Sequence, residues 1–98
     1  MNTMDTYNGY KNKDTWRAML YINNNDDIMY KTIYNMIESN IIKNIIYSYI
    51  YSQLETYIQE NNLSIDIDKI SITDIYEHIY LDVEYNERIN LVKNIDIE

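Results

Sequence analysis

Residues 41–60, IIKNIIYSYIYSQLETYIQE, decide the fold class of this 98-residue chain. An apolar residue recurs at every fourth position of the stretch, at Ile42, Ile46, Ile50, Leu54 and Ile58. This spacing places the side chains along one face of a helix. Isoleucine works against helix propensity because it is β-branched, but a strand of this length would lie far outside the usual range. The stretch therefore predicts a long helix.

The segments on either side of this stretch carry helical spacing as well, so the expected fold class is all-α. Asparagine clusters take over the boundary role of proline and glycine, because the chain has no proline and one glycine. Ser39–Asn40 marks either a bend or a new helix cap. We expect one domain over 1–98, a small bundle of four to five helices. Its segments are an arm or turn over 1–11, a short tryptophan helix over 12–23, a long or bent helix pair over 26–60, a helix over 71–83 and a terminal helix over 84–95.

Residues 63–70, LSIDIDKI, alternate apolar and polar side chains. No second strand is predicted that could pair with this segment, so we expect an extended connector that packs its isoleucines inward. The next residue, Ser71, suits an N-cap, and Asp74 three residues later completes the pattern of a capping box. A helix is therefore predicted to begin here.

The only glycine and the only tryptophan of the chain lie close together, at Gly9 and Trp16. Gly9 supplies backbone freedom that other residues lack, which predicts that residues 7–10 fold back. Asn12 is a favourable N-cap for the helix that follows. Because a helix of about ten residues needs tertiary packing to be stable, we expect Trp16 to anchor it to the core.

The negative charge of the chain is concentrated in one half. The net charge is −8, and all of it arises from residues 54–98, because acidic and basic residues balance before that point. Such a surface disfavours direct nucleic-acid binding and favours a basic partner, although acidity also serves solubility alone. The chain has no cysteine, no apolar run near the roughly 18 residues that span a membrane and no signal-peptide pattern. We expect a cytoplasmic protein without membrane contact.

The chain carries one motif near each end. The N-terminal motif consists of Tyr7, Asn8, Gly9, Tyr10, Asn12, Asp14, Thr15, Trp16, Leu20, Asn24 and Asp26. The C-terminal motif consists of Ser71, Ile72, Asp74, Ile75, His78 and Asp82. Together they resemble the motifs of a family of small, uncharacterised phage and plasmid proteins, with Ser71 in place of the usual aspartate. The resemblance spans roughly residues 7–84, and the middle of this chain is richer in isoleucine and tyrosine than the family. It implies a mobile-element setting and a small helical fold, and it implies no catalytic residues.

The candidate chemistry of the chain centres on its only histidine. Asp74 and Asp82 lie four residues to either side of His78 on one helix face. Two carboxylates and one imidazole on a single helix make a labile metal site, so surface hydrogen bonding is the favoured role. The sequence has no nucleophile elbow and no glycine-rich phosphate loop. We expect neither an enzyme nor a resident metal or cofactor.

Tyrosine is abundant, with 12 residues against no phenylalanine. It either replaces phenylalanine at the margin of the core or anchors a protein interface. Stacking on single-stranded bases is disfavoured, since no basic groove is predicted. Tyr47 and Tyr51 share one helix face, as do Tyr76 and Tyr80, and these four are the candidates for a contact with a partner or a second copy.

These features predict a protein that acts by binding another protein. The expected function is phage-type counter-defence, in which the acidic half mimics nucleic acid and occupies the basic channel of a host immune nuclease, such as a CRISPR effector. The alternative is a structural or regulatory homodimer of a mobile element, paired through the Ile/Tyr helix, with no host target. The candidate partner-binding acids, expected to form one negative patch, are Asp66, Asp68, Asp74, Glu77, Asp82, Glu84 and Glu87.

Overall fold

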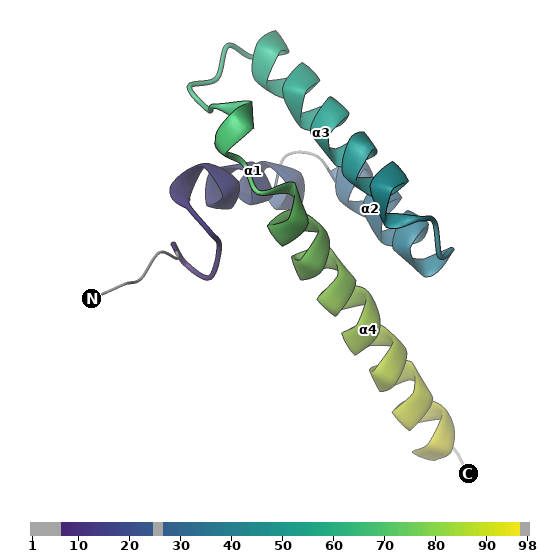
Figure 1. The fold of residues 1–98 in the computed structure, drawn as a ribbon. Coiled ribbons are helices and arrows are strands. Elements are labelled where there is room, and N and C mark those ends of the chain that lie inside the picture. The colour runs from purple at the N-terminus through teal and green to yellow at the C-terminus, as the bar shows by residue number, and fades with distance from the viewer. Residues whose placement is uncertain (1–6, 25–26, 97–98) are drawn as a thin grey trace.

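The computed structural model describes residues 7–24 and 27–96, and over these residues the chain is a small all-α domain (Figure 1). Its helices are α1 (Lys13–Asn24), α2 (Asp27–Glu38), α3 (Lys43–Glu60) and α4 (Ile72–Asp96), with a 3₁₀ turn, η1 (Ile67–Lys69), before α4. Figure 1 shows α2 and α3 side by side, with α1 at one end of the pair. Helix α4 packs against the other three. The all-α class expected from the sequence is confirmed.

The core is built mainly from isoleucines of α2, α3 and the first half of α4. Ile46, Ile50 and Leu54 of α3 are buried, as their four-residue spacing predicts. Ile42 is 68 % exposed, so its expected place on the same buried face is wrong. Helix α3 begins only at Lys43, with Ile42 as its N-cap. Ile42, the first member of the repeat, therefore precedes the first helical turn, and its side chain does not reach the core.

Left-handed asparagines end both helices of the α2–α3 pair. Asn40 has φ 59° and Asn62 has φ 51°. After α2, the Ile41 N–H donates to the Met36 carbonyl oxygen at 3.0 Å, which is the long hydrogen bond of a Schellman motif. The same pattern closes α3. The helix pair expected over 26–60 therefore forms two separate helices over its described part, 27–60, and Ser39–Asn40 follows the end of the first of them.

The connector between α3 and α4 packs inward as expected. Ile65 and Ile70 are buried, and Ile67 packs against the core. The segment is extended only at its ends, because η1 interrupts it. The Asp66 side chain caps this turn by accepting the Asp68 N–H at 3.0 Å, a local bond that aspartate makes readily.

Helix α4 is one continuous helix of 25 residues. The expected boundary between a helix over 71–83 and a terminal helix over 84–95 is therefore wrong. No glycine or proline interrupts the sequence there, and the Tyr80 hydroxyl donates to Glu84 Oε2 at 3.0 Å across the expected boundary. Figure 1 shows the C-terminal part of α4 running past α2 and α3. The radius of gyration is 15.3 Å, against about 13 Å for a compact domain of this size.

Helix α1 contributes a different face to the core than the tryptophan pattern predicts. Ala18, Met19 and Ile22 are buried, together with the polar Thr15. Trp16 is only half-buried and lies outside this core. Its expected role as the core anchor is wrong, because the buried stripe is displaced by one residue around the helix.

Candidate interaction surface

The structure divides the candidate acids of α4 between two sides of the helix. Asp74 and Asp82 contact the N-terminal segment and α2 respectively. Glu77, Glu84 and Glu87 lie on another side at spacings of seven and three residues, beside Tyr80. We call these three glutamates, together with Tyr80, the open flank. The remaining acids, Asp66 and Asp68, lie at η1. The expectation of one negative patch is therefore wrong.

Residues 7–10 form the turn that Gly9 predicts. Tyr7 and Tyr10 exchange two backbone hydrogen bonds, of 2.6 and 2.9 Å. Asn8 has φ 52° and Gly9 has φ 90°, and positive φ at both central residues defines a type I′ turn. The Tyr7 ring packs on Trp16 with 5.0 Å between ring centroids. Trp16 therefore holds the turn against α1.

The same turn is attached to α4 by three contacts. The Lys11 backbone N–H donates to Asp74 Oδ2 at 2.6 Å. His78 Nε2 lies 3.4 Å from the Gly9 carbonyl oxygen, and the His78 ring stacks on Tyr10 with centroids 4.1 Å apart. The histidine thus contacts its own N-terminal segment. Asp74 is bonded within the chain and does not belong to a free binding surface.

A buried hydroxyl joins the start of α1 to the start of α4. Asn12 caps α1 as expected, because its Oδ1 accepts the Thr15 N–H at 2.8 Å. The Thr15 hydroxyl also donates to Asn12 Oδ1 at 2.8 Å and accepts the Ser71 N–H at 2.8 Å. Asn12 Nδ2 donates to the Lys69 carbonyl oxygen at 2.8 Å. Two of these four hydrogen bonds cross to the start of α4 and fix its entry relative to α1, and the other two hold Asn12 and Thr15 together.

The capping box at the start of α4 is only half formed. Ser71 Oγ accepts the Asp74 N–H at 3.3 Å, which confirms Ser71 as the N-cap. The reciprocal bond is replaced, since the Ser71 N–H donates to Thr15 and the Asp74 carboxylate accepts from Lys11. The two groups that would close the box, the Ser71 N–H and the Asp74 carboxylate, bind the N-terminal part of the chain instead.

Helix α2 holds the middle of α4 through two tyrosine hydroxyls. The Tyr30 hydroxyl donates to Asp82 Oδ2 at 2.6 Å, and Asn86 Nδ2 donates to the Tyr34 hydroxyl oxygen at 2.8 Å. Burial raises the pKa of Tyr30, and the hydrogen bond to Asp82 raises it further. Burial, then the charge of Asp82, also raises the pKa of Tyr10. Asp82 is thus bound to α2 and is not a free surface acid.

Alkaline pH is expected to weaken the fold through Tyr30. Its pKa is higher in the folded chain than in the unfolded one, so its contribution is complete below about pH 10 and is lost as the pH rises further. Urea unfolding of wild type and Tyr30→Phe across that range tests this. We expect the free energy of unfolding to fall less steeply with pH in Tyr30→Phe. Equal slopes would show that the Tyr30–Asp82 bond carries no such linkage.

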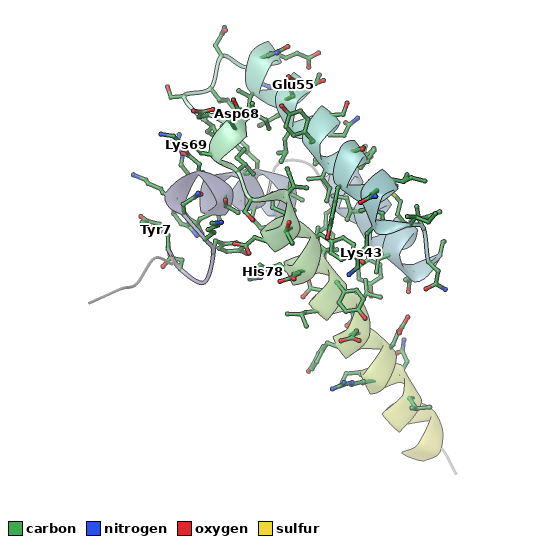
Figure 2. All side chains as sticks on the ribbon, viewed as in Figure 1. Tyr7, Lys43, Glu55, Asp68, Lys69 and His78 are labelled. Atoms are coloured by element: carbon green, nitrogen blue, oxygen red, sulfur yellow. The ribbon has the colours of Figure 1, made fainter. Side chains whose placement is uncertain are left out.

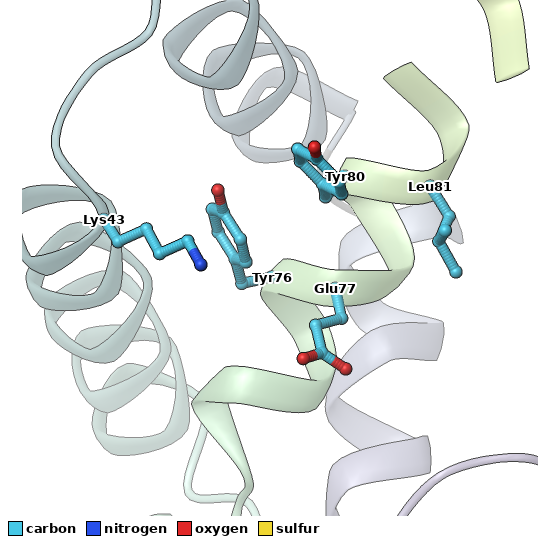
Figure 3. Close-up of a pocket in the computed structure, with 5 residues that line it drawn as sticks. All are labelled: Lys43, Tyr76, Glu77, Tyr80 and Leu81. Atoms are coloured by element: carbon cyan, nitrogen blue, oxygen red, sulfur yellow. The ribbon is translucent and has the colours of Figure 1, made fainter. Parts of the chain in front are cut away.

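A groove of about 340 Å³ borders the open flank, lined by Lys43, Tyr76, Glu77, Tyr80 and Leu81 (Figure 3). The Lys43 Nζ, from α3, lies 5.7 Å from the centre of the Tyr76 ring, within cation–π range. Glu77 and Leu81 are exposed on the α4 side. The groove therefore offers an apolar floor with one cation and one carboxylate at its edge.

The four candidate tyrosines separate into core and surface residues. Tyr76 is buried, at 6 % exposure, so its expected place at an interface is wrong. Its ring packs edge-on against Tyr47, with centroids 5.3 Å apart, and stacks on Tyr80 at 5.9 Å. Tyr47 is half-buried. Tyr51 and Tyr80 remain exposed, on α3 and α4 respectively, and only Tyr80 lies beside the acids.

The acids at η1 form a separate site on the molecule. Asp66 and Asp68 are exposed, and Figure 2 shows Asp68 next to Lys69 near α1, away from the C-terminal part of α4. Within the described residues, no three His, Cys, Asp or Glu side chains are grouped as a metal site requires. None of the helices described combines the length and apolar character needed to cross a bilayer.

Comparisons of the chain with protein-family models, with curated proteins and with solved structures found no match. The site therefore has to be judged from its own geometry. Sequence reasoning found the glutamates of the open flank but missed their apolar neighbours on α4, Leu81 and Leu91. Both are strongly exposed, at 59 % and 61 %. The signal in the sequence that could have found them is a spacing of alternately four and three residues, which runs through Glu77, Leu81, Glu84, Arg88 and Leu91.

Proposed function

We propose that this protein is a non-enzymatic counter-defence factor of a phage or plasmid, which binds and inhibits a host immune nuclease. The observation that carries the proposal is the open flank, which presents Glu77, Glu84 and Glu87 on one side of a projecting helix. The distance along the helix axis from Glu77 to Glu87 is about 15 Å. About four nucleotides along one DNA strand rise by the same distance. The flank thus supports mimicry of a short run of phosphates.

The ordering of the flank adds to this argument. The Tyr80 hydroxyl holds Glu84 by a hydrogen bond of 3.0 Å, and this bond raises the pKa of Tyr80. A carboxylate that is already oriented loses less conformational entropy when a partner binds. The exposed Tyr80 ring beside it suits an interface anchor. A basic channel would meet both features on the same helix face.

The setting of the proposal comes from the resemblance to phage and plasmid proteins. The structure adds a physical reason for the two motifs that carry the resemblance, because they contact each other. The Tyr10 ring stacks on His78, and His78 Nε2 lies 3.4 Å from the Gly9 carbonyl oxygen. The Ser71 N–H donates to the Thr15 hydroxyl. The motifs thus fix the position of α4, and the acids of the open flank lie outside them.

Reversing two acids of the open flank is expected to abolish partner binding. Immobilised wild-type chain should retain a nucleic-acid-binding protein from host lysate, identified by mass spectrometry. The variant Glu77→Lys/Glu87→Lys should retain it at least tenfold less, because two attractive charge contacts become repulsive. Raising the salt concentration should weaken the wild-type interaction, as it weakens other contacts between exposed charges.

The matched control is Glu38→Lys/Glu60→Lys, which changes the net charge by the same amount at exposed ends of α2 and α3. We expect this control to bind as wild type does. Equal loss in both variants would show that only the total charge matters, and unchanged binding of Glu77→Lys/Glu87→Lys would contradict the proposed surface.

A further inference from the structure

A stripe on the outer side of α4 follows the spacing of a coiled-coil seam. Its members, separated alternately by four and three residues, are Glu77, Leu81, Glu84, Arg88 and Leu91. Leu81 is 59 % and Leu91 61 % exposed, and Arg88 is exposed between them. Leu81 and Leu91 are therefore two large apolar side chains exposed on the same stripe of α4.

The stripe faces away from the rest of the fold. The buried residues of α4 are Ile75, Tyr76, Ile79 and Val83, which lie on the opposite side of the helix by its periodicity. Toward the C-terminal half of α4, Asn86 Nδ2 donates to the Tyr34 hydroxyl oxygen of α2 at 2.8 Å. Beyond this point α4 runs past α2 and α3 (Figure 1). Covering the exposed Leu81 and Leu91 would remove apolar surface from water and so stabilise this side of α4.

We infer that a second copy of the chain covers this stripe, as an antiparallel pair of α4 helices related by a two-fold axis. In the antiparallel register centred on Asn86, Leu81 faces Leu91 of the second copy, and Glu84 faces Arg88 of the second copy. The two-fold axis repeats each contact. The interface therefore has two leucine contacts and two ion pairs.

Other arrangements of the same two helices are less favourable. A parallel pair would place Glu84 against Glu84 and Arg88 against Arg88, so like charges would oppose each other along the seam. Moving the antiparallel register by one heptad toward the N-terminus would place Leu81 against Glu84 of the second copy. Only the register centred on Asn86 matches the leucines with each other and the charges with their opposites.

The side chains beside the seam fit this arrangement. The Tyr80 hydroxyl orients Glu84, and a carboxylate accepts several hydrogen bonds, so Glu84 can still accept from Arg88 of the second copy. Near the two-fold axis, Tyr85, which is 65 % exposed, lies next to Tyr85 of the second copy. Glu87 also lies next to Glu87 of the second copy. This contact is at the solvent-exposed rim of the seam, where the repulsion between the two carboxylates is screened by salt.

This dimer does not rest on the proposed function, although it is compatible with it. In the pair, Glu84 is engaged by Arg88 of the second copy, while Glu77 at the end of the seam and Glu87 at its rim stay accessible, so the dimer would present these two acids. The dimer also differs from pairing through α3, because the apolar face of that helix is buried in its own core.

Sedimentation velocity of the purified chain tests the inference. The seam is short, so we expect weak, concentration-dependent dimerisation between about 10 µM and about 500 µM. Glu84→Arg and Arg88→Glu should each be monomeric over this range, with a dissociation constant raised at least tenfold. An equimolar mixture of the two variants should form a heterodimer, because every Arg then faces a Glu. The double variant Glu84→Arg/Arg88→Glu should dimerise as wild type does.

The control variant is Ile45→Gln, which changes an exposed apolar residue on α3 and should leave dimerisation unchanged. Circular dichroism verifies that all variants fold. A wild-type chain that stays monomeric throughout would overturn the inference and leave the stripe to a partner of different sequence. A dimer that is indifferent to both charge changes would overturn it too, since another surface would then be responsible. The proposed function has its own readout, the host protein retained by Glu77→Lys/Glu87→Lys, and sedimentation velocity of that variant shows whether its dimer is intact.

Discussion

Replacing Ile50 with alanine is expected to lower the free energy of unfolding by roughly 2–5 kcal/mol. Ile50 lies in the middle of α3 and is fully buried, at 0 % exposure. The truncation removes apolar contacts and leaves a cavity that the surrounding side chains fill only in part. The higher helix propensity of alanine offsets less than about 0.7 kcal/mol of this loss. Urea unfolding followed by circular dichroism measures the difference.

The matched control for this change is Ile42→Ala. Ile42 belongs to the same four-residue repeat, but it precedes α3 and is 68 % exposed. We expect its replacement to change the free energy of unfolding by no more than about 0.5 kcal/mol. Equal losses at the two positions would mean that α3 begins a turn earlier and that the repeat is buried along its whole length.

Replacing Thr15 with valine is expected to cost about 2–3 kcal/mol, because it removes a hydroxyl that makes two hydrogen bonds at a buried position. The shape of the side chain is nearly unchanged, so packing is preserved. The Ser71 N–H loses its acceptor and Asn12 loses one of its two donors. The N-terminal turn should loosen as a consequence, and the fluorescence of Trp16, which packs on Tyr7, would report it.

Thr73→Val is the corresponding control, since Thr73 is exposed in the first turn of α4. It makes the same chemical change without breaking the link to α1, and we expect an effect within about 0.5 kcal/mol. If Thr15→Val were as mild as Thr73→Val, the hydrogen bonds between the starts of α1 and α4 would contribute little to the fold.

Helix identity could be predicted from periodicity, but helix boundaries depended on details that periodicity does not contain. Ile46, Ile50 and Leu54 are buried as predicted, since the repeat fixes which face of α3 turns inward. The left-handed Asn62 confirms the helix end expected there. The break expected before Glu84 is absent, because nothing in the local sequence ends α4. The sequence predicts Trp16 as the anchor of α1, yet the smaller Thr15 and Ala18 are the residues buried there.

The candidate site was predicted less well, because a sequence shows which residues are acidic but not which of them have partners. Asp74 and Asp82 looked equivalent to the glutamates of α4. Their partners, Lys11 and Tyr30, lie 63 and 52 residues away in the chain, a separation that no local pattern reveals. The same long-range packing removed Tyr76 from the surface.

Helix α4 has one side held by the rest of the fold and another side turned outward. The N-terminal segment, α1 and α2 hold one side of it through hydrogen bonds to Asp74, Ser71 and Asp82. The other side carries the open flank and the leucine stripe. A flank on a fixed helix meets a partner already in place, which favours binding over a flexible acidic tail.

Competition with nucleic acid tests the central claim most directly. The host protein retained by the chain would be purified and bound to a fluorescently labelled oligonucleotide, and the wild-type chain would then be added while fluorescence anisotropy is recorded. We predict that anisotropy falls to that of the free oligonucleotide, and that Glu77→Lys/Glu87→Lys leaves it unchanged. A ternary complex, with oligonucleotide and chain bound to the host protein at once, would contradict the account.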